Sequence, residues 1–175
     1  FSTTCSMTPT YCRKARKVVV EVNTLTPWCL GGLDETIHIS QVDMVVEGPN
    51  SRLVQLPELE ASEADRIIAN HVMGLLEDGS TIQLGIGALP NIVGAMIARS
   101  GLKDLGVHTE MLADSYVDMY EAGRITGKHK GIDRGKMVYT FALGSQKLYD
   151  FLDNNHVAAI FPVSYTNDPN VIGSN

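Results

Sequence analysis

The sequence predicts an α/β protein whose mostly parallel sheet is flanked by helices. Short apolar runs of strand length alternate with amphipathic runs of helix length over most of the 175 residues. Near the middle, a glycine turn at Gly85–Gly87 separates an apolar run from a helical one, as in a strand-turn-helix unit. An acidic connector around Pro57 to Ser62 separates two such regions. We therefore expect two lobes, over residues 1–57 and 58–175.

The first lobe is predicted to contain two strands, the first of them buried. The β-branched run Lys17–Val22 has strand length and an apolar character typical of a buried strand, and Val42–Val46 is a second run of strand length. Residues 1–10 are Ser/Thr-rich and indicate a loop or a weak strand. The basic run Arg13–Lys17 is interpreted as a solvated turn, and Trp28 as a packed loop anchor that does not stack on a ligand.

The second lobe is predicted to open with an amphipathic helix. Ser62 and Asp65 form a weak capping-box signal at its start. Apolar residues at helical spacing follow: Ala64, Ile67, Ile68, Val72, Leu75 and Leu76. His71 lies on this stripe and is expected to be a partly buried packing residue.

Residues 81–111 form the central β-α-β unit of the prediction. A strand from Thr81 to Leu84 leads into the glycine turn, and Pro90 occupies the first turn of the helix that follows. A second strand is expected over Val107–Met111, with the Glu110 carboxylate near its end. Because the carboxyl ends of parallel strands lie at one edge of a sheet, Gly85–Gly87 and Glu110 are expected to face the same crevice.

Further strands and helices are predicted after the central unit. We expect a helix over Asp114–Glu121, a strand over Lys136–Ala142, a short helix capped by Ser145 and a last strand over Val157–Phe161. The tail from Asn167 is expected to be loop.

The composition excludes several classes of protein. A hydrophobic fraction of 44% with a net charge of −6 fits a folded domain and argues against nucleic-acid or anionic-membrane surfaces. The three Cys residues lack a C-x-x-C pair, and the five His residues are scattered, so we predict reduced thiols and no metal site. No apolar run reaches the length of a membrane span. The cysteine usage predicts a cytoplasmic protein. The chain starts at Phe1 without an initiator Met, which we interpret as the mark of an internal fragment.

On spacing alone, the glycine turn leaves open both a dinucleotide site and a plain tight turn without a ligand. Gly85 and Gly87 match the first two glycines of a dinucleotide fingerprint, and Glu110 lies near the distance of its ribose-binding carboxylate. Pro90 occupies the third glycine position, which argues against a nicotinamide-dependent oxidoreductase. A carboxylate facing the free amides of a glycine turn suits acyl transfer. The alternative without a catalytic role is that the Glu110 carboxylate caps a helix or pairs with Lys103.

Several stretches occur in an order and spacing that resemble a known family. They are Glu21–Asn23 with Pro27, Gly85–Asn91, His108–Met111 with Asp114, Gly135–Lys136, Phe141–Ser145, Leu148–Phe151 and Asn154–Asn155. On these stretches the chain resembles the acetyl-CoA hydrolase/transferase family, and within it the butyryl-CoA:acetate and 4-hydroxybutyrate CoA-transferases. Two departures are Asp114-Ser115, where relatives often have Asp-Gly, and Pro27–Leu30, where a polar stretch is more usual.

The resemblance implies a two-lobed CoA-transferase fold in which Glu110 is the nucleophile and the Ile86 backbone N–H an oxyanion donor. The residues implied to line the CoA site are Gly85, Gly87, Ala88, Leu89, Pro90 and Asn91. A second glycine-rich segment of the site is expected beyond Asn175, so the chain alone is not expected to turn over.

The resemblance also implies the substrates. They are an acyl-CoA, with butyryl-CoA favoured, and a carboxylate, with acetate favoured; a 4-hydroxybutyrate transferase and an acetyl-CoA hydrolase are the alternatives within the family. Coenzyme A is then a substrate, with no tightly bound cofactor and no metal. Neither nucleic acid nor a membrane is an expected partner, and self-association is left open. A non-catalytic acyl-CoA-binding fragment is the third class of function that we consider.

Overall fold

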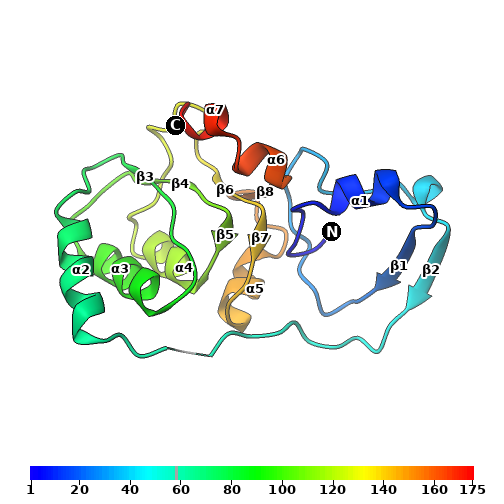
Figure 1. Ribbon diagram of the computed structural model, residues 1–175, viewed down its shortest axis with the longest axis horizontal. Coiled ribbons are helices and arrows are strands. Elements are labelled where there is room, and N and C mark those ends of the chain that lie inside the picture. The colour runs from blue at the N-terminus through cyan, green and yellow to red at the C-terminus, as the bar shows by residue number, and fades with distance from the viewer. Residues whose placement is uncertain (58) are drawn as a thin grey trace.

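A computed structural model describes residues 1–57 and 59–175 of the chain (Figure 1). The strands are β1 (Val19–Val22), β2 (Met44–Glu47), β3 (Thr81–Ile82), β4 (Gly106–His108), β5 (Met111–Leu112), β6 (Met137–Tyr139), β7 (Phe141–Ala142) and β8 (Ala158–Ile160). The helices are α1 (Thr8–Lys14), the 3-10 turn η1 (Ile39–Gln41), α2 (Glu63–Met73), α3 (Ala88–Arg99), α4 (Asp114–Glu121), α5 (Gln146–Leu152), α6 (Val163–Thr166) and α7 (Pro169–Ile172). Every pair of named strands is parallel, which confirms the predicted α/β class.

The main sheet has the strand order β3-β4-β6-β8. Most residues of these strands are buried and belong to the hydrophobic core. Its register pairs Ile82 with Val107, and Val107 with Met137. Helices α2, α3 and α4 pack against one another in sequence and lie side by side in Figure 1. Since β3, α3 and β4 form a parallel crossover unit, the loop after β3 and the end of β4 lie at the same edge of the sheet.

Two predicted strands each break into two short ones. The run Val107–Met111 divides into β4 and β5, and the run Lys136–Ala142 into β6 and β7. The second pieces pair with each other and leave the main sheet, with Met111 opposite Phe141. Prediction of one continuous strand in each place was wrong, because each run has strand length and contains no glycine or proline at the break to mark a change of sheet.

Helix α2 starts at the predicted capping box. The Asp65 N–H donates to Ser62 Oγ at 3.2 Å, and the Ser62 N–H donates to Asp65 Oδ2 at 2.8 Å. Only part of the predicted apolar stripe is covered: α2 packs mainly on α3, and Ile67, Ile68 and Leu75 are exposed. His71 is also exposed, so its prediction as a partly buried packing residue was wrong.

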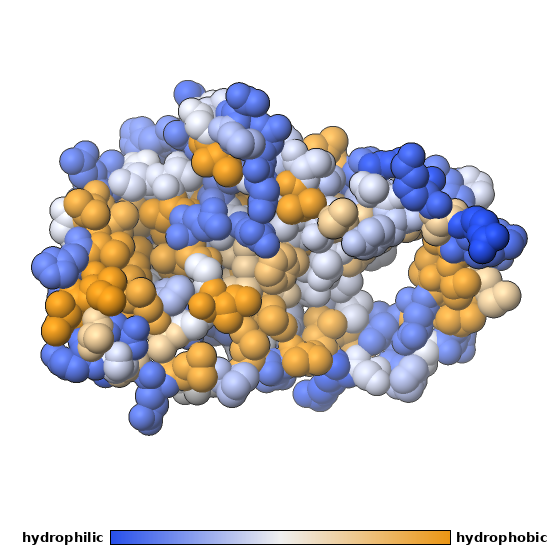
Figure 2. Space-filling view, in the orientation of Figure 1, coloured by the Kyte–Doolittle hydropathy of each residue, from blue (hydrophilic) through white to orange (hydrophobic). Residues whose placement is uncertain are grey.

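The strand pair β1–β2 confirms the two predicted strands but contradicts the prediction that the first is buried. The two strands pair in parallel from Val19 with Met44 to Val22 with Glu47, yet nearly all their residues are exposed. Figure 2 shows the resulting apolar patch at the right of the molecule. Their apolar residues on both faces are typical of a parallel strand covered on both sides, but no described element covers either face.

Three other predictions in the peripheral segments were wrong. The Trp28 side chain is 68% exposed, because this loop is anchored by its backbone: the Trp28 N–H donates to Asp153 Oδ1 at 2.8 Å. Residues 8–10, predicted as loop or weak strand, and Arg13–Lys14, predicted as turn, lie in α1. The tail after Asn167, predicted as loop, contains α7, and the Asp168 side chain at its start accepts two backbone N–H groups. Glu58, part of the predicted acidic connector, lies outside the described residues.

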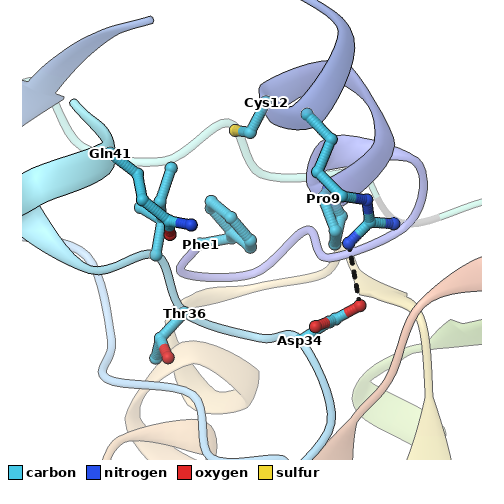
Figure 3. A pocket seen from close by; sticks show the side chains of 8 residues that line it. Phe1, Pro9, Cys12, Asp34, Thr36 and Gln41 are labelled. Carbon is cyan, nitrogen blue, oxygen red and sulfur yellow. Dashed lines mark hydrogen bonds and ion pairs between the residues drawn. The ribbon is translucent and has the colours of Figure 1, made fainter. Parts of the chain in front are cut away.

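A small hollow of about 150 Å³ lies in the first part of the chain (Figure 3). The side chains of Phe1, Pro9 and Cys12 border it, and the Arg13 guanidinium pairs with Asp34 at 3.0 Å on its rim. Its lining contains none of the predicted site residues. Within the described part of the chain, no helix is both long and apolar enough to cross a membrane.

Candidate active site

Glu110 lies at the point where the chain steps from β4 to β5. Its backbone carbonyl accepts hydrogen bonds from the N–H groups of Thr140 (3.0 Å) and Phe141 (3.2 Å), which lie at the matching step from β6 to β7. The side chain is exposed, and Oε2 accepts a hydrogen bond from Asn167 Nδ2 at 2.9 Å. Among the described ion pairs there is none between Glu110 and Lys103. The structure thus presents a carboxylate to solvent on a backbone that is held in place.

The glycine turn joins β3 to α3 and offers free amide groups. Gly87 precedes α3 with φ 128°, a conformation that glycine adopts without strain. A Cβ on Gly85 would meet no atom within 4 Å, so the approach to this turn is open. Within the described residues, the N–H groups of Gly85, Ile86 and Gly87 donate to no protein acceptor. Together with the first amides of α3 they form an array suited to a negatively charged oxygen.

The glycine turn and Glu110 extend the same edge of the main sheet. Strands β3 and β4 are parallel neighbours that pair through Ile82 and Val107. Two residues later, Thr109 Oγ1 lies 3.5 Å from the Leu84 carbonyl oxygen, so the strands remain side by side up to the turn. The shared edge predicted from the β-α-β pattern is therefore present.

A buried histidine fixes the segment that contacts Glu110. His108 Nε2 lies 2.8 Å from the Thr166 carbonyl oxygen, and Nδ1 lies 3.2 Å from Asn175 Nδ2. Burial lowers the pKa of His108, so the neutral ring donates from Nε2 and accepts at Nδ1. The Thr166 hydroxyl in turn donates to Asn167 Oδ1 at 3.0 Å, which leaves the Asn167 amide nitrogen directed at Glu110. Sequence reasoning missed Asn167 because it fell in a tail predicted as loop.

Comparison with known proteins identifies the family of this chain. A sequence model of the acetyl-CoA hydrolase/transferase N-terminal domain matches residues 1–57. A probable butyrate:acetyl-CoA coenzyme A-transferase of Syntrophomonas wolfei is 49% identical over 168 residues, which are 96% of this chain and 37% of that protein. A butyryl-CoA:acetate CoA-transferase of Anaerostipes caccae is 51% identical over 156 residues, 89% of this chain and 35% of that protein. The chain belongs to the acetyl-CoA hydrolase/transferase family.

A solved structure extends this comparison to the fold. The crystal structure of RipA from Yersinia pestis matches with a TM-score of 0.92 at 36% identity, over 99% of this chain and 39% of that one. This family member thus spans a little over a third of the length of the proteins that it matches.

Asp114 in the family motif has a structural partner. Its two carboxylate oxygens accept hydrogen bonds from the N–H (2.8 Å) and the hydroxyl (2.6 Å) of Ser145, the N-cap of α5. The next residue, Ser115, packs against Gly94 of α3, where a Cβ would lie 2.5 Å from Ser115 Cβ.

Basic residues between α4 and β6 form hydrogen bonds within the protein. Lys130 is buried, and its Nζ donates to the carbonyl oxygens of Val107 (3.0 Å) and Lys136 (3.1 Å). Burial lowers the pKa of Lys130 from 10.5 to about 8. Arg124 donates to the Ala98 carbonyl at 3.2 Å. In the described residues there is also no cluster of His, Cys, Asp and Glu arranged to hold a metal ion.

Proposed function

We propose that this chain carries the nucleophile of a CoA-transferase that moves CoA between an acyl-CoA and a carboxylate. One observation carries the proposal: the exposed carboxylate of Glu110 and the free amides of the Gly85–Gly87 turn lie at one edge of the sheet. Two relatives at 49% and 51% identity that are named as CoA-transferases support it. The alternative of a Rossmann-type, dinucleotide-binding oxidoreductase has no comparable support, since Pro90 occupies the third glycine position of the fingerprint and lies inside the first turn of α3.

In the proposed reaction, a Glu110 oxygen attacks the thioester carbon of the acyl-CoA. The carbon–sulfur bond breaks, which gives a mixed anhydride on Glu110 and free CoA thiolate. The thiolate then attacks the Glu110 carbonyl carbon, so that the original acyl group leaves as a carboxylate and a glutamyl-CoA thioester remains. The acceptor carboxylate repeats the two steps in reverse, which gives the new acyl-CoA and restores Glu110.

The glycine turn supplies the electrostatic part of the proposal. Each attack places negative charge on a carbonyl oxygen, and backbone N–H groups at 2.7–3.1 Å from that oxygen stabilise it. We assign this role to the Ile86 N–H, whose donor is free in the described structure. The open face of the turn and the start of α3 are proposed to contact the pantetheine chain of CoA. The residues assigned to this contact are Gly85, Gly87, Ala88, Leu89, Pro90 and Asn91.

For the substrates we propose butyryl-CoA and acetate, because two relatives at 49% and 51% identity are named as CoA-transferases of butyrate with acetyl-CoA and of butyryl-CoA with acetate. CoA is then a dissociable substrate, with no tightly bound cofactor, and the reaction takes place in the cytoplasm. We further propose that residues 1–57 end the N-terminal lobe and that residues 58–175 begin the C-terminal lobe. The match of the N-terminal domain model to residues 1–57 supports the first part of this division.

The proposal is tested with the polypeptide as its source organism makes it. Glu110→Gln keeps the size of the side chain but cannot form the anhydride, so exchange between butyryl-CoA and acetate should fall by at least about 1,000-fold with the fold intact. The matched control is Glu77→Gln, an exposed glutamate before β3 at the opposite edge of the sheet, which should exchange at the wild-type rate. Borohydride added to the wild type with butyryl-CoA should reduce the thioester to an alcohol on Glu110, seen by peptide mass spectrometry. Label on another residue, or full activity of Glu110→Gln, would refute the assignment.

A further inference from the structure

Leu84, the residue before the glycine turn, is held by side chains after strand pairing has ended. The ladder between β3 and β4 stops at Ile82. The Leu84 N–H donates to the hydroxyl of Tyr116 at 2.5 Å, and Tyr116 comes from α4. Because no strand supplies an acceptor at this position, the Tyr116 hydroxyl replaces the next bond of the ladder.

Tyr116 is suited to a fixed position. It is 0% exposed and is among the largest fully buried side chains of the described residues. Burial raises the pKa of Tyr116 to about 12, against smaller opposing effects of the Thr109 hydroxyl and the Leu84 amide. The phenol therefore stays neutral at ordinary pH, and its hydroxyl remains available to accept from Leu84.

The same group lies beside the backbone that flanks Glu110. Thr109, which is 0% exposed, adjoins the Tyr116 hydroxyl, and its own hydroxyl donates to the Met111 carbonyl at 2.9 Å. Thr109 and Met111 precede and follow Glu110. One buried cluster of two hydroxyls thus contacts both the entry to the glycine turn and the two neighbours of Glu110.

We propose that Tyr116 is a positioning residue for the transfer reaction, setting the Gly85–Gly87 turn at its working distance from Glu110. The inference rests on the proposed function. The far end of the turn is fixed by α3, where the Asn91 N–H donates to the Gly87 carbonyl at 3.2 Å. The near end has the Tyr116 hydroxyl at Leu84. Removing that hydroxyl frees one end of a loop whose amides stabilise the oxyanion only over a range of a few tenths of an ångström.

The test compares two tyrosines of the same helix in the polypeptide as its source organism makes it. Tyr116→Phe removes the hydroxyl and keeps the buried ring, and Tyr120→Phe is the control, since Tyr120 packs by its ring edge on Phe151. We expect kcat of butyryl-CoA:acetate exchange to fall about tenfold in Tyr116→Phe, with KM for butyryl-CoA within twofold of wild type, and no change in Tyr120→Phe. A wild-type kcat in Tyr116→Phe, or the same loss in both variants, would overturn the inference.

A second measurement uses the wild type alone and decides the matter if Tyr116→Phe does not fold. Hydrogen exchange with residue-level mass spectrometry should find the Leu84 amide protected about as well as the Ile82 amide, and an unprotected Leu84 amide overturns the inference. Glu110→Gln separates this result from the proposed function. If Glu110→Gln still exchanges, the proposed function fails; if it is inactive while Tyr116→Phe is fully active, only the positioning role fails.

Discussion

The contact between α3 and α4 predicts a measurable steric coupling between Gly94 and Ser115. A Cβ on Gly94 would lie 2.5 Å from Ser115 Cβ and 3.0 Å from Ser115 Oγ. Carbon atoms in contact are normally about 3.5–4.0 Å apart, so the two helices would have to separate by about 1 Å. Overpacking of this kind costs about 1–3 kcal/mol, while replacing glycine by alanine inside a helix returns up to about 1 kcal/mol. We expect Gly94→Ala to lower the free energy of unfolding by about 1–2 kcal/mol.

The coupling is measured by a double-mutant cycle in urea, followed by far-UV circular dichroism. Ser115→Gly removes both atoms that the new methyl group would meet, so Gly94→Ala should cost at least about 1 kcal/mol less in that background. The remaining neighbour, Leu84 Cδ1 at 3.3 Å, is the end of a side chain that can rotate away. A Gly94→Ala protein as stable as wild type, or an equal cost in both backgrounds, would refute the steric account.

Three further predictions follow from single contacts. Asn167→Ala removes the donor to Glu110 Oε2 and should slow CoA exchange by about tenfold to 100-fold, measured as kcat with an unchanged thermal midpoint; a wild-type rate would contradict it. Asp114→Ala removes both hydrogen bonds to Ser145 and should lower the free energy of unfolding in urea by about 2–3 kcal/mol; a change below about 0.5 kcal/mol would be inconsistent with this contact. Because the pKa of Lys130 is lowered in the folded state from 10.5 to about 8, the unfolded state binds more protons between these values, and stability should rise with pH across this window by roughly 3 kcal/mol relative to Lys130→Met; parallel pH profiles of the two proteins would argue against it.

The sequence predicted elements well where local signals and periodicity agreed. The helix over Asp114–Glu121 has the predicted bounds, and the start of α2 has the capping box indicated by Ser62 and Asp65. The parallel arrangement that brings the glycine turn and Glu110 to one edge also followed from the alternation of elements. Each of these features depends on residues that are close in sequence or on a general rule of chain topology.

What the sequence could not predict depends on neighbours that are distant along the chain. Asn167 reaches Glu110 only because Thr166 packs over His108, a contact across 58 residues for which local patterns carry no signal. The break at Thr140 leaves the apolar pattern of its strand unchanged, since both new strands are still covered. Trp28 shows the opposite error, because an aromatic residue in a loop usually packs, but here the backbone carries the anchoring hydrogen bonds.

The change of sheet at Glu110 has a mechanical consequence for the proposed reaction. The strand before this residue and the strand after it belong to different sheets. The N–H groups of Thr140 and Phe141 fix its backbone carbonyl. Its Cα is therefore held in place, while the exposed carboxylate can rotate about three side-chain torsions when its hydrogen bond to Asn167 Nδ2 is released. Ordering one glutamate side chain costs at most about 2 kcal/mol, whereas ordering a loop costs about 1–2 kcal/mol for every residue. In the proposed reaction, the Glu110 side chain can thus reorient from the acyl donor to CoA and then to the acceptor while its backbone stays in place.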